Sequence, residues 1–194
     1  MSSASIDHRL QNLSRQIVRA RAVYDLWWLV AGKPTRKPHA DTFDQYGSFF
    51  LFLEHALLGA AIVQASVPFD RSKGALSLSR LIRDMTTSGL LSPVVASALD
   101  ARLAGVSEEL ARVKLLRDRA VAHLMDRKGP LAFNQAFTEA GLRPVDMKAL
   151  VDRAMEVVNA LLEARGSAAI FPNEFPAQDG LTLLQDLTKM LQDQ

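Results

Sequence analysis

The clearest chemistry in the sequence lies in one short run, from Arg117 to His123. Arginine stays charged at physiological pH and binds phosphate through its planar guanidinium, whereas histidine exchanges protons near neutral pH. A phosphate binder beside a proton-transfer group is the minimum needed to cleave RNA. We therefore treat Arg117 and His123 as candidate catalytic residues.

An ideal helix places Arg117 inside the apolar arc of its segment. At about 100° per residue, Val113 and Leu124 project within roughly 60° of Arg117. An unpaired charge in such an arc is costly, so we expect Arg117 to have a partner. His123 lies about 120° from Arg117, within reach of a shared site. Arg119 is four positions before His123 on one face, which we expect to be solvated.

Positive charge gathers around this run. The chain has 23 Lys and Arg against 21 Asp and Glu, and its net charge of +2 does not by itself indicate nucleic acid. Between residues 112 and 128, however, six positive side chains face two negative ones, a local charge of +4. Arg119, Arg127 and Lys128 are therefore candidate substrate-binding residues, and Asp118 lies among them.

Composition excludes several classes of site and protein. With 194 residues and 48% hydrophobic content, the chain suits one sizeable core, and the absence of cysteine excludes disulfides and zinc–thiolate sites. No glycine-rich phosphate loop, HExxH motif or carboxylate cluster indicates a metal or another cofactor. Glu54 and His55 interrupt the most apolar segment and leave a run of eight residues, far below the roughly 20 needed to cross a bilayer. We expect a soluble, cytoplasmic protein with no membrane segment.

Hydrophobic periodicity predicts helices throughout the first two thirds of the chain. The first covers residues 6–31, and a loop follows at 33–40. A second, from Asp41 or Thr42 to Ser66, is apolar on nearly every face and is expected to be central. After a turn at 68–74, a short helix opens at Ser77 or Ser79, and one long helix, which Gly105 can bend, covers 93–126.

The rest of the chain continues the helical pattern. Short and long helices are predicted at residues 133–140 and 144–165, an extended linker at 167–179, and an amphipathic helix from Leu181 onward. The fold class is therefore all-α, with about five to seven helices in a bundle at 1–166 and a C-terminal helical appendage at 167–194.

At the arginine and histidine, the chain resembles the HEPN superfamily of all-α bundles. The hallmark of that superfamily is an arginine, often followed by a polar residue, with a histidine after four to six intervening positions. Arg117, Asp118 and His123 match it. The aromatic first helix, the apolar second helix and the segment 69–78 resemble the AbiU-like abortive-infection branch, over about residues 8–165.

The resemblance implies a function as well as a fold. Many HEPN proteins are metal-independent ribonucleases that act as toxins or phage-defence effectors, and they typically form homodimers with a composite cleft. His123 would then move protons, Arg117 would bind the scissile phosphate of RNA, and Asp118 would orient one of them or line the cleft. An antitoxin or another defence-system protein is a candidate partner. A non-catalytic HEPN module that binds nucleotide, nucleic acid or a protein partner is the alternative. A helical scaffold without a ligand is a third.

Three further groups of residues have open roles. Glu54 is predicted to face the helix that carries Arg117 and His123 (the motif helix) and to pair with Arg117. An ordinary ion pair or a solvated helix edge explains the presence of Glu54 equally well. Asp70, Arg71 and Lys73 either border a substrate cleft or form a solvated capping turn. Helical spacing favours core or dimer packing over base stacking for the five aromatic residues Trp27, Trp28, Phe49, Phe50 and Phe52.

Overall fold

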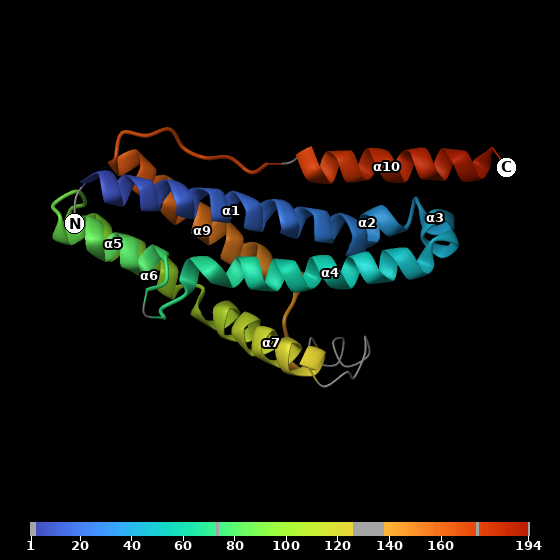
Figure 1. Cartoon of the computed structure of the whole chain (residues 1–194), viewed down its shortest axis with the longest axis horizontal. Helices are drawn as coiled ribbons and strands as arrows, with labels where there is room; N and C mark the ends of the chain where they lie inside the picture. Colours follow the sequence, from blue (N-terminus) through green and yellow to red (C-terminus); the bar gives the residue numbers. More distant parts are fainter. Residues whose placement is uncertain (1–2, 73, 126–137, 174, 194) are drawn as a thin grey trace.

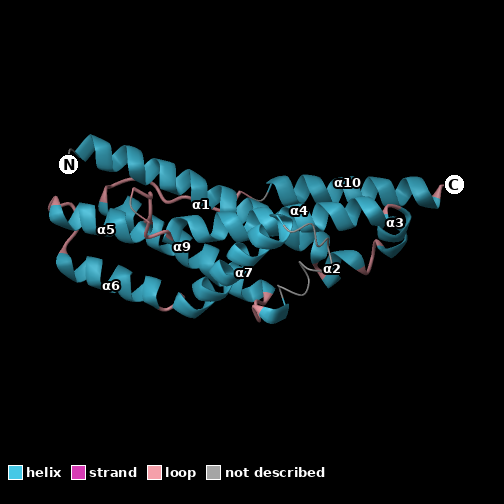
Figure 2. Cartoon of the chain, turned by 60° about the horizontal axis from the view of Figure 1, so that its bottom comes forward, coloured by secondary structure: helices cyan, strands magenta, loops and turns pink. Residues whose placement is uncertain are grey.

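The computed structural model describes residues 3–72, 74–125, 138–173 and 175–193, and these residues form helices and loops without any strand (Figures 1 and 2). The predicted all-α fold class is confirmed. The described α-helices are α1 (Ser3–Ala31), α2 (Lys33–Arg36), α3 (Ala40–Gln45), α4 (Gly47–Ser66), α5 (Leu78–Thr87), α6 (Pro93–Ala104), α7 (Ser107–Met125), α9 (Pro144–Ala164) and α10 (Phe175–Gln192).

Helix α1 is the central element of the bundle, in contact with α4, α5, α9 and α10. Its buried residues recur every three or four positions and include Ile6, Leu10, Leu13, Ile17, Tyr24 and Trp27. Helix α9, at the position of the long helix predicted at 144–165, supplies the opposing apolar stripe from Leu150 to Leu162. Full burial of each large aliphatic side chain contributes about 1.5–3 kcal/mol. These two helices therefore form the rigid base on which the other elements are placed.

Helix α4 lies beside α1, but it is not the central helix that its composition predicts (Figure 1). Its C-terminal half is buried at Leu58, Ile62 and Ala65, whereas Phe49 and Phe52 in its N-terminal half are exposed. The prediction is wrong there because no other described helix covers that face. Of the five aromatic residues considered above, Trp27 and Phe50 are in the core, and the others are at the surface.

By length and composition alone, one helix among the described residues could cross a membrane, the stretch Gly47–Phe69 formed by α4 and the following turn. The core helix of a soluble protein meets the same criteria, and about a third of this stretch is buried inside the fold. Midway along it, Glu54 forms an ion pair with Arg36. The carboxylate of Glu54, which interrupts the apolar run in the sequence, is thus paired with a charged partner in the fold.

Two predicted helices are each broken into two. The segment expected to run from Asp41 or Thr42 to Ser66 is divided at Tyr46 into α3 and α4. The long helix expected at 93–126 is divided at Gly105 into α6 and α7, and Ser107 opens α7 with two glutamates in its first turn. Acidic residues there stabilise a helix N-terminus, a signal that the apolar periodicity had hidden. The break allows α7 to leave the α4 side of the bundle at an angle (Figure 1).

Polar contacts place α7 against α9. The carboxylate of Asp146, with only 3% of its side chain exposed, accepts hydrogen bonds from the backbone and side chain of Arg143 and contacts Arg112 of α7 at 3.4 Å. Burial raises the pKa of Asp146, but the hydrogen bonds and charge of Arg143, with the charge of Arg112, hold it below its usual value. The ionised carboxylate therefore joins α7 to the start of α9.

The C-terminal segment becomes helical earlier than predicted. Helix α10 begins at Phe175, inside the stretch expected to be an extended linker, while residues 167–173 are extended. It packs along α1 and meets α3, where the hydroxyl of Thr188 contacts both His39 and Thr42 at 2.8 Å. The predicted short helix at 133–140 lies almost wholly outside the described residues.

Candidate functional site

Arg117 lies on α7 with a carboxylate partner from its own helix. Its guanidinium contacts the carboxylate of Asp118, at 2.9 Å from Nη2 and 3.0 Å from Nε. About a third of the Arg117 side chain is exposed, while Val113 and Leu116 of the same helix are fully buried. Arg117 therefore sits at the edge of the buried face and reaches water, where a charged ligand has access to it.

The predicted pairing of Glu54 with Arg117 is wrong. Glu54 contacts Arg36 at 2.6 Å, and Arg117 contacts Asp118. Arg36 also donates to the carbonyl of Val30 and lies over the ring of Phe43, so it is held in place on the α2 side of α4. The carboxylate of Glu54 is thus directed toward α2, and a neighbour adjacent in sequence supplies the partner that Arg117 requires.

The loop before α5 brings a second carboxylate toward the motif. Asp70 accepts a hydrogen bond from the backbone N–H of Ser72 at 2.8 Å, which forms a tight turn; the residue at the cap position of α5 is Ser77. The hydrogen bonds from Ser72 lower the pKa of Asp70, and the nearby positive charges of Lys114 and Arg117 lower it further. The Asp70 turn therefore lies within electrostatic range of Lys114 and Arg117 on α7, although the spacing of Lys114 gave no sign of this.

The other predicted site residues are placed only in part. His123 and Arg119 belong to the same helix as Arg117, and His123 is six positions after Arg117, a rise of about 9 Å along the helix axis. The side chains of His123 and Arg119 are outside the described part of the structure, as are Arg127 and Lys128 altogether. The predicted location of arginine and histidine on one helix is confirmed, while their mutual side-chain geometry stays a prediction.

A cavity of about 440 Å³ opens beside the Asp70 turn, between the 71–79 segment and α5. Three arginines line it, Arg71, Arg80 and Arg83, and none of its described lining residues is acidic. Sequence reasoning missed Arg80 and Arg83 because they lie far along the chain from the motif and follow ordinary helical spacing. The sequence did carry one indication of this cavity: Arg71 precedes a predicted helix that has Arg80 and Arg83 about one turn apart.

The family model for the AbiU2 HEPN proteins matches residues 3–182, which is nearly the whole described bundle. The chain belongs to the AbiU2 family of HEPN proteins. The match extends beyond the resemblance noted in the sequence and includes the first part of α10. No curated protein and no solved structure matches the chain. This AbiU2-family chain is accordingly a HEPN module related to abortive infection.

Proposed function

We propose that this AbiU2-family protein is a metal-independent endoribonuclease of a defence or toxin system. The observation that carries the proposal is the placement of Arg117 on α7. Its guanidinium is oriented by Asp118 and partly open to solvent, and it lies on the same helix as His123. A bidentate guanidinium binds phosphate and stabilises the negative charge that develops during cleavage.

In the proposed reaction, the ribose 2′-oxygen attacks the adjacent phosphorus, and the bond from phosphorus to the 5′-oxygen breaks. An imidazole of His123 accepts the 2′-hydroxyl proton, and a protonated imidazole donates a proton to the departing 5′-oxygen. The products are a 2′,3′-cyclic phosphate and a 5′-hydroxyl end. Arg117 holds the phosphate, and Asp118 holds Arg117.

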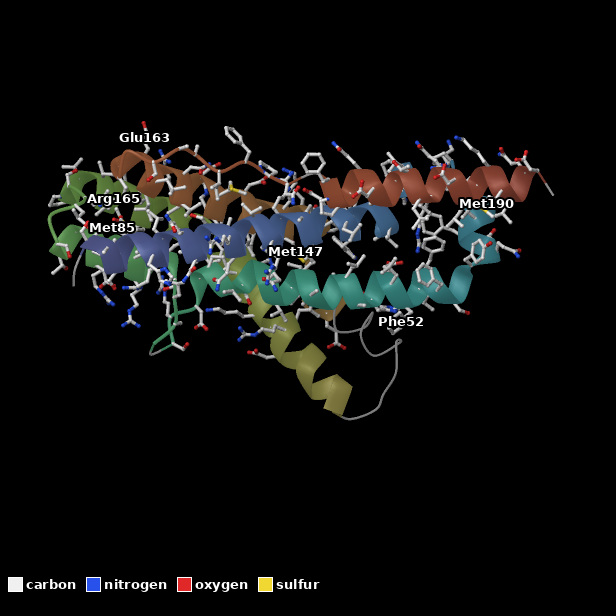
Figure 3. All side chains as sticks on the ribbon, turned by 45° about the horizontal axis from the view of Figure 1, so that its top comes forward. Phe52, Met85, Met147, Glu163, Arg165 and Met190 are labelled. Carbon is white, nitrogen blue, oxygen red and sulfur yellow. The ribbon has the colours of Figure 1, made fainter. Side chains whose placement is uncertain are left out.

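We also propose that two copies of the chain complete the cleft, because one histidine serves as base and another as acid. Exposed apolar side chains support an interface between copies, especially Phe49, which is more than half exposed, and Phe52, with 72% of its surface exposed. Figure 3 shows Phe52 on α4 toward the Met190 end of the molecule, away from Arg165. Light scattering at micromolar concentration should give the mass of a dimer, and a strict monomer would contradict this part of the proposal.

The direct test is RNA cleavage in the presence of EDTA. Wild-type protein should leave cyclic phosphate ends, while His123→Ala and Arg117→Ala should lose at least about 100-fold in rate. Arg19→Ala is the matched control, because Arg19 is exposed on α1 and forms no ion pair with another described residue. Equal cleavage by all four proteins would place the activity elsewhere, and inactivity of wild-type protein on varied RNAs would favour a non-catalytic binding module.

A further inference from the structure

The strongest feature outside the motif is the arginine-lined cavity between the 71–77 loop and the start of α5. Arg71 and Arg83 form no ion pair with any described residue. Arg80 reaches Asp84 only at 4.0 Å, and the same carboxylate oxygen is already bound by Arg9 at 2.6 Å. Three arginines with little compensating negative charge thus line one cavity. Arginines in such an arrangement favour an anion with several acceptor oxygens.

Ser77, which lines the cavity, differs from the serine at the equivalent position before α6. Ser92, the residue before α6, accepts a hydrogen bond from the backbone N–H of Val95. Ser77 holds the same position before α5, yet its side chain caps no backbone group. It is only 3% exposed, and it lines the cavity. A hydroxyl that is largely buried gains free energy from each hydrogen bond it makes, so Ser77 favours a ligand with a polar group at this wall.

The start of α5 adds to the positive field in the cavity. First-turn N–H groups carry partial positive charge and lack partners within the helix. Ser77 leaves them uncapped, and Gly74, with a φ of +91°, gives the loop a bend that a side chain would strain. Arg71 of this loop lines the cavity together with Arg80 and Arg83 of α5. Charge, hydroxyl and backbone all select the chemistry of a phosphate.

Two observations link this phosphate to a nucleic acid strand. A second hollow of about 490 Å³ adjoins the first and shares Arg71, Ser79 and Arg83 with it. A phosphate bound in the first cavity therefore has room for its flanking nucleoside in the second. Asp70, the neighbour of Arg71, lies near enough to Lys114 and Arg117 for their charges to act on its carboxylate. We propose that the cavity binds a backbone phosphate of the RNA substrate, outside the bond that is cut. This inference rests on the proposed ribonuclease function.

The test separates binding from cleavage. A labelled, fully 2′-O-methylated single-stranded RNA has no free 2′-hydroxyl, so its affinity can be measured by fluorescence anisotropy without cleavage. Arg71→Ala and Arg83→Ala should each weaken binding about 5- to 10-fold, and the slope of log Kd against log salt should fall by about 0.7 for each phosphate that is no longer neutralised. Arg19→Ala should bind as wild type. With cleavable RNA, the two cavity variants should raise KM more than they lower kcat.

The outcomes distinguish the phosphate site from the ribonuclease activity. Unchanged RNA affinity in a folded Arg71→Ala/Arg83→Ala double variant overturns the cavity proposal, whether or not the protein cleaves RNA. Arginine-dependent binding by a protein that cuts no RNA supports the phosphate site and removes the ribonuclease. If the double variant loses binding of inorganic pyrophosphate or ATP but keeps that of RNA, the ligand is a small phosphate compound and the RNA assignment is wrong. Ser77→Ala, which removes no capping bond, should weaken RNA binding with unchanged thermal stability.

Discussion

Two groups of described arginines differ in their partners. In the first group, Arg21 contacts Asp25 and Asp152, which joins α1 to α9, and Arg165 contacts Asp7 at the start of α1. Around the 70–77 loop, Arg71 and Arg83 have no carboxylate partner among the described residues. Arginines paired across two helices hold those helices together, whereas the unpaired arginines beside the cavity are available to a ligand. The two groups should therefore respond in opposite ways to substitution.

The largest expected effect separates activity from stability. Arg117→Ala should reduce RNA cleavage at least about 100-fold, because it removes the group proposed to bind the scissile phosphate. Its thermal unfolding temperature should change little, since the side chain is partly exposed and its partner Asp118 is solvated. Cleavage rates and calorimetry on the same preparation check both statements. A large drop in unfolding temperature would move Arg117 into the structural group.

The next effect concerns the buried carboxylate that joins α7 to α9. Asp146→Asn should lower the free energy of unfolding by about 2–3 kcal/mol at neutral pH, because it removes charge-assisted hydrogen bonds to Arg143 and Arg112. Urea unfolding monitored by circular dichroism measures the difference. A change below about 0.5 kcal/mol would show that this carboxylate does not hold the motif helix.

The pH dependence of that difference has a defined sign. The folded protein holds the pKa of Asp146 below the ordinary value of 3.8, so its contribution to stability is present above that pH and is lost as pH falls through the folded pKa. The gap between wild type and Asp146→Asn should therefore shrink on acidification from neutrality to about pH 3. A gap that widened in acid would mean that the carboxyl is bound in its protonated form.

A smaller effect compares the two arginine groups directly. Arg21→Ala should cost about 1–2 kcal/mol, because four fifths of the side chain is buried between two carboxylates. Arg71→Ala, at an exposed unpaired arginine, should stay within about 0.5 kcal/mol of wild type. Chemical unfolding of the two variants side by side is the measurement. Equal losses would remove the distinction between the groups.

The smallest effect tests whether burial or pairing governs the contribution to stability of the two cations, Arg21 and Lys148, that contact Asp152. Lys148 contacts Asp152 one helical turn away, with nearly half of its side chain exposed. Lys148→Ala should change stability by less than about 0.5 kcal/mol, and added salt should reduce the difference further. A loss comparable to that of Arg21→Ala would mean that pairing alone governs these ion pairs.

Local pattern predicted most of the helices and the family. Apolar spacing placed the buried stripes of α1 and α9, and the spacing of Arg117 and His123 indicated HEPN proteins, which the family match bears out. The sequence-based prediction failed in two places, at the face of α4 that no described helix covers and at the break between α6 and α7. The exposure of Phe52 depends on which helices pack against α4. The break at Gly105 depends on weak local signals for a helix end, which the continuous apolar periodicity hides.

By itself, the sequence determined the helical fold class and the placement of Arg117 and His123 on one helix, because helical periodicity and residue spacing are local properties. Only the tertiary structure decided which charges are paired. Glu54 meets Arg36 and not Arg117, and Arg21 meets Asp152, which lies 131 positions away. Arg71, Arg80 and Arg83 surround a cavity for the same reason. The free energy of a charge depends on what lies within a few ångströms, and the packing of the helices sets those distances.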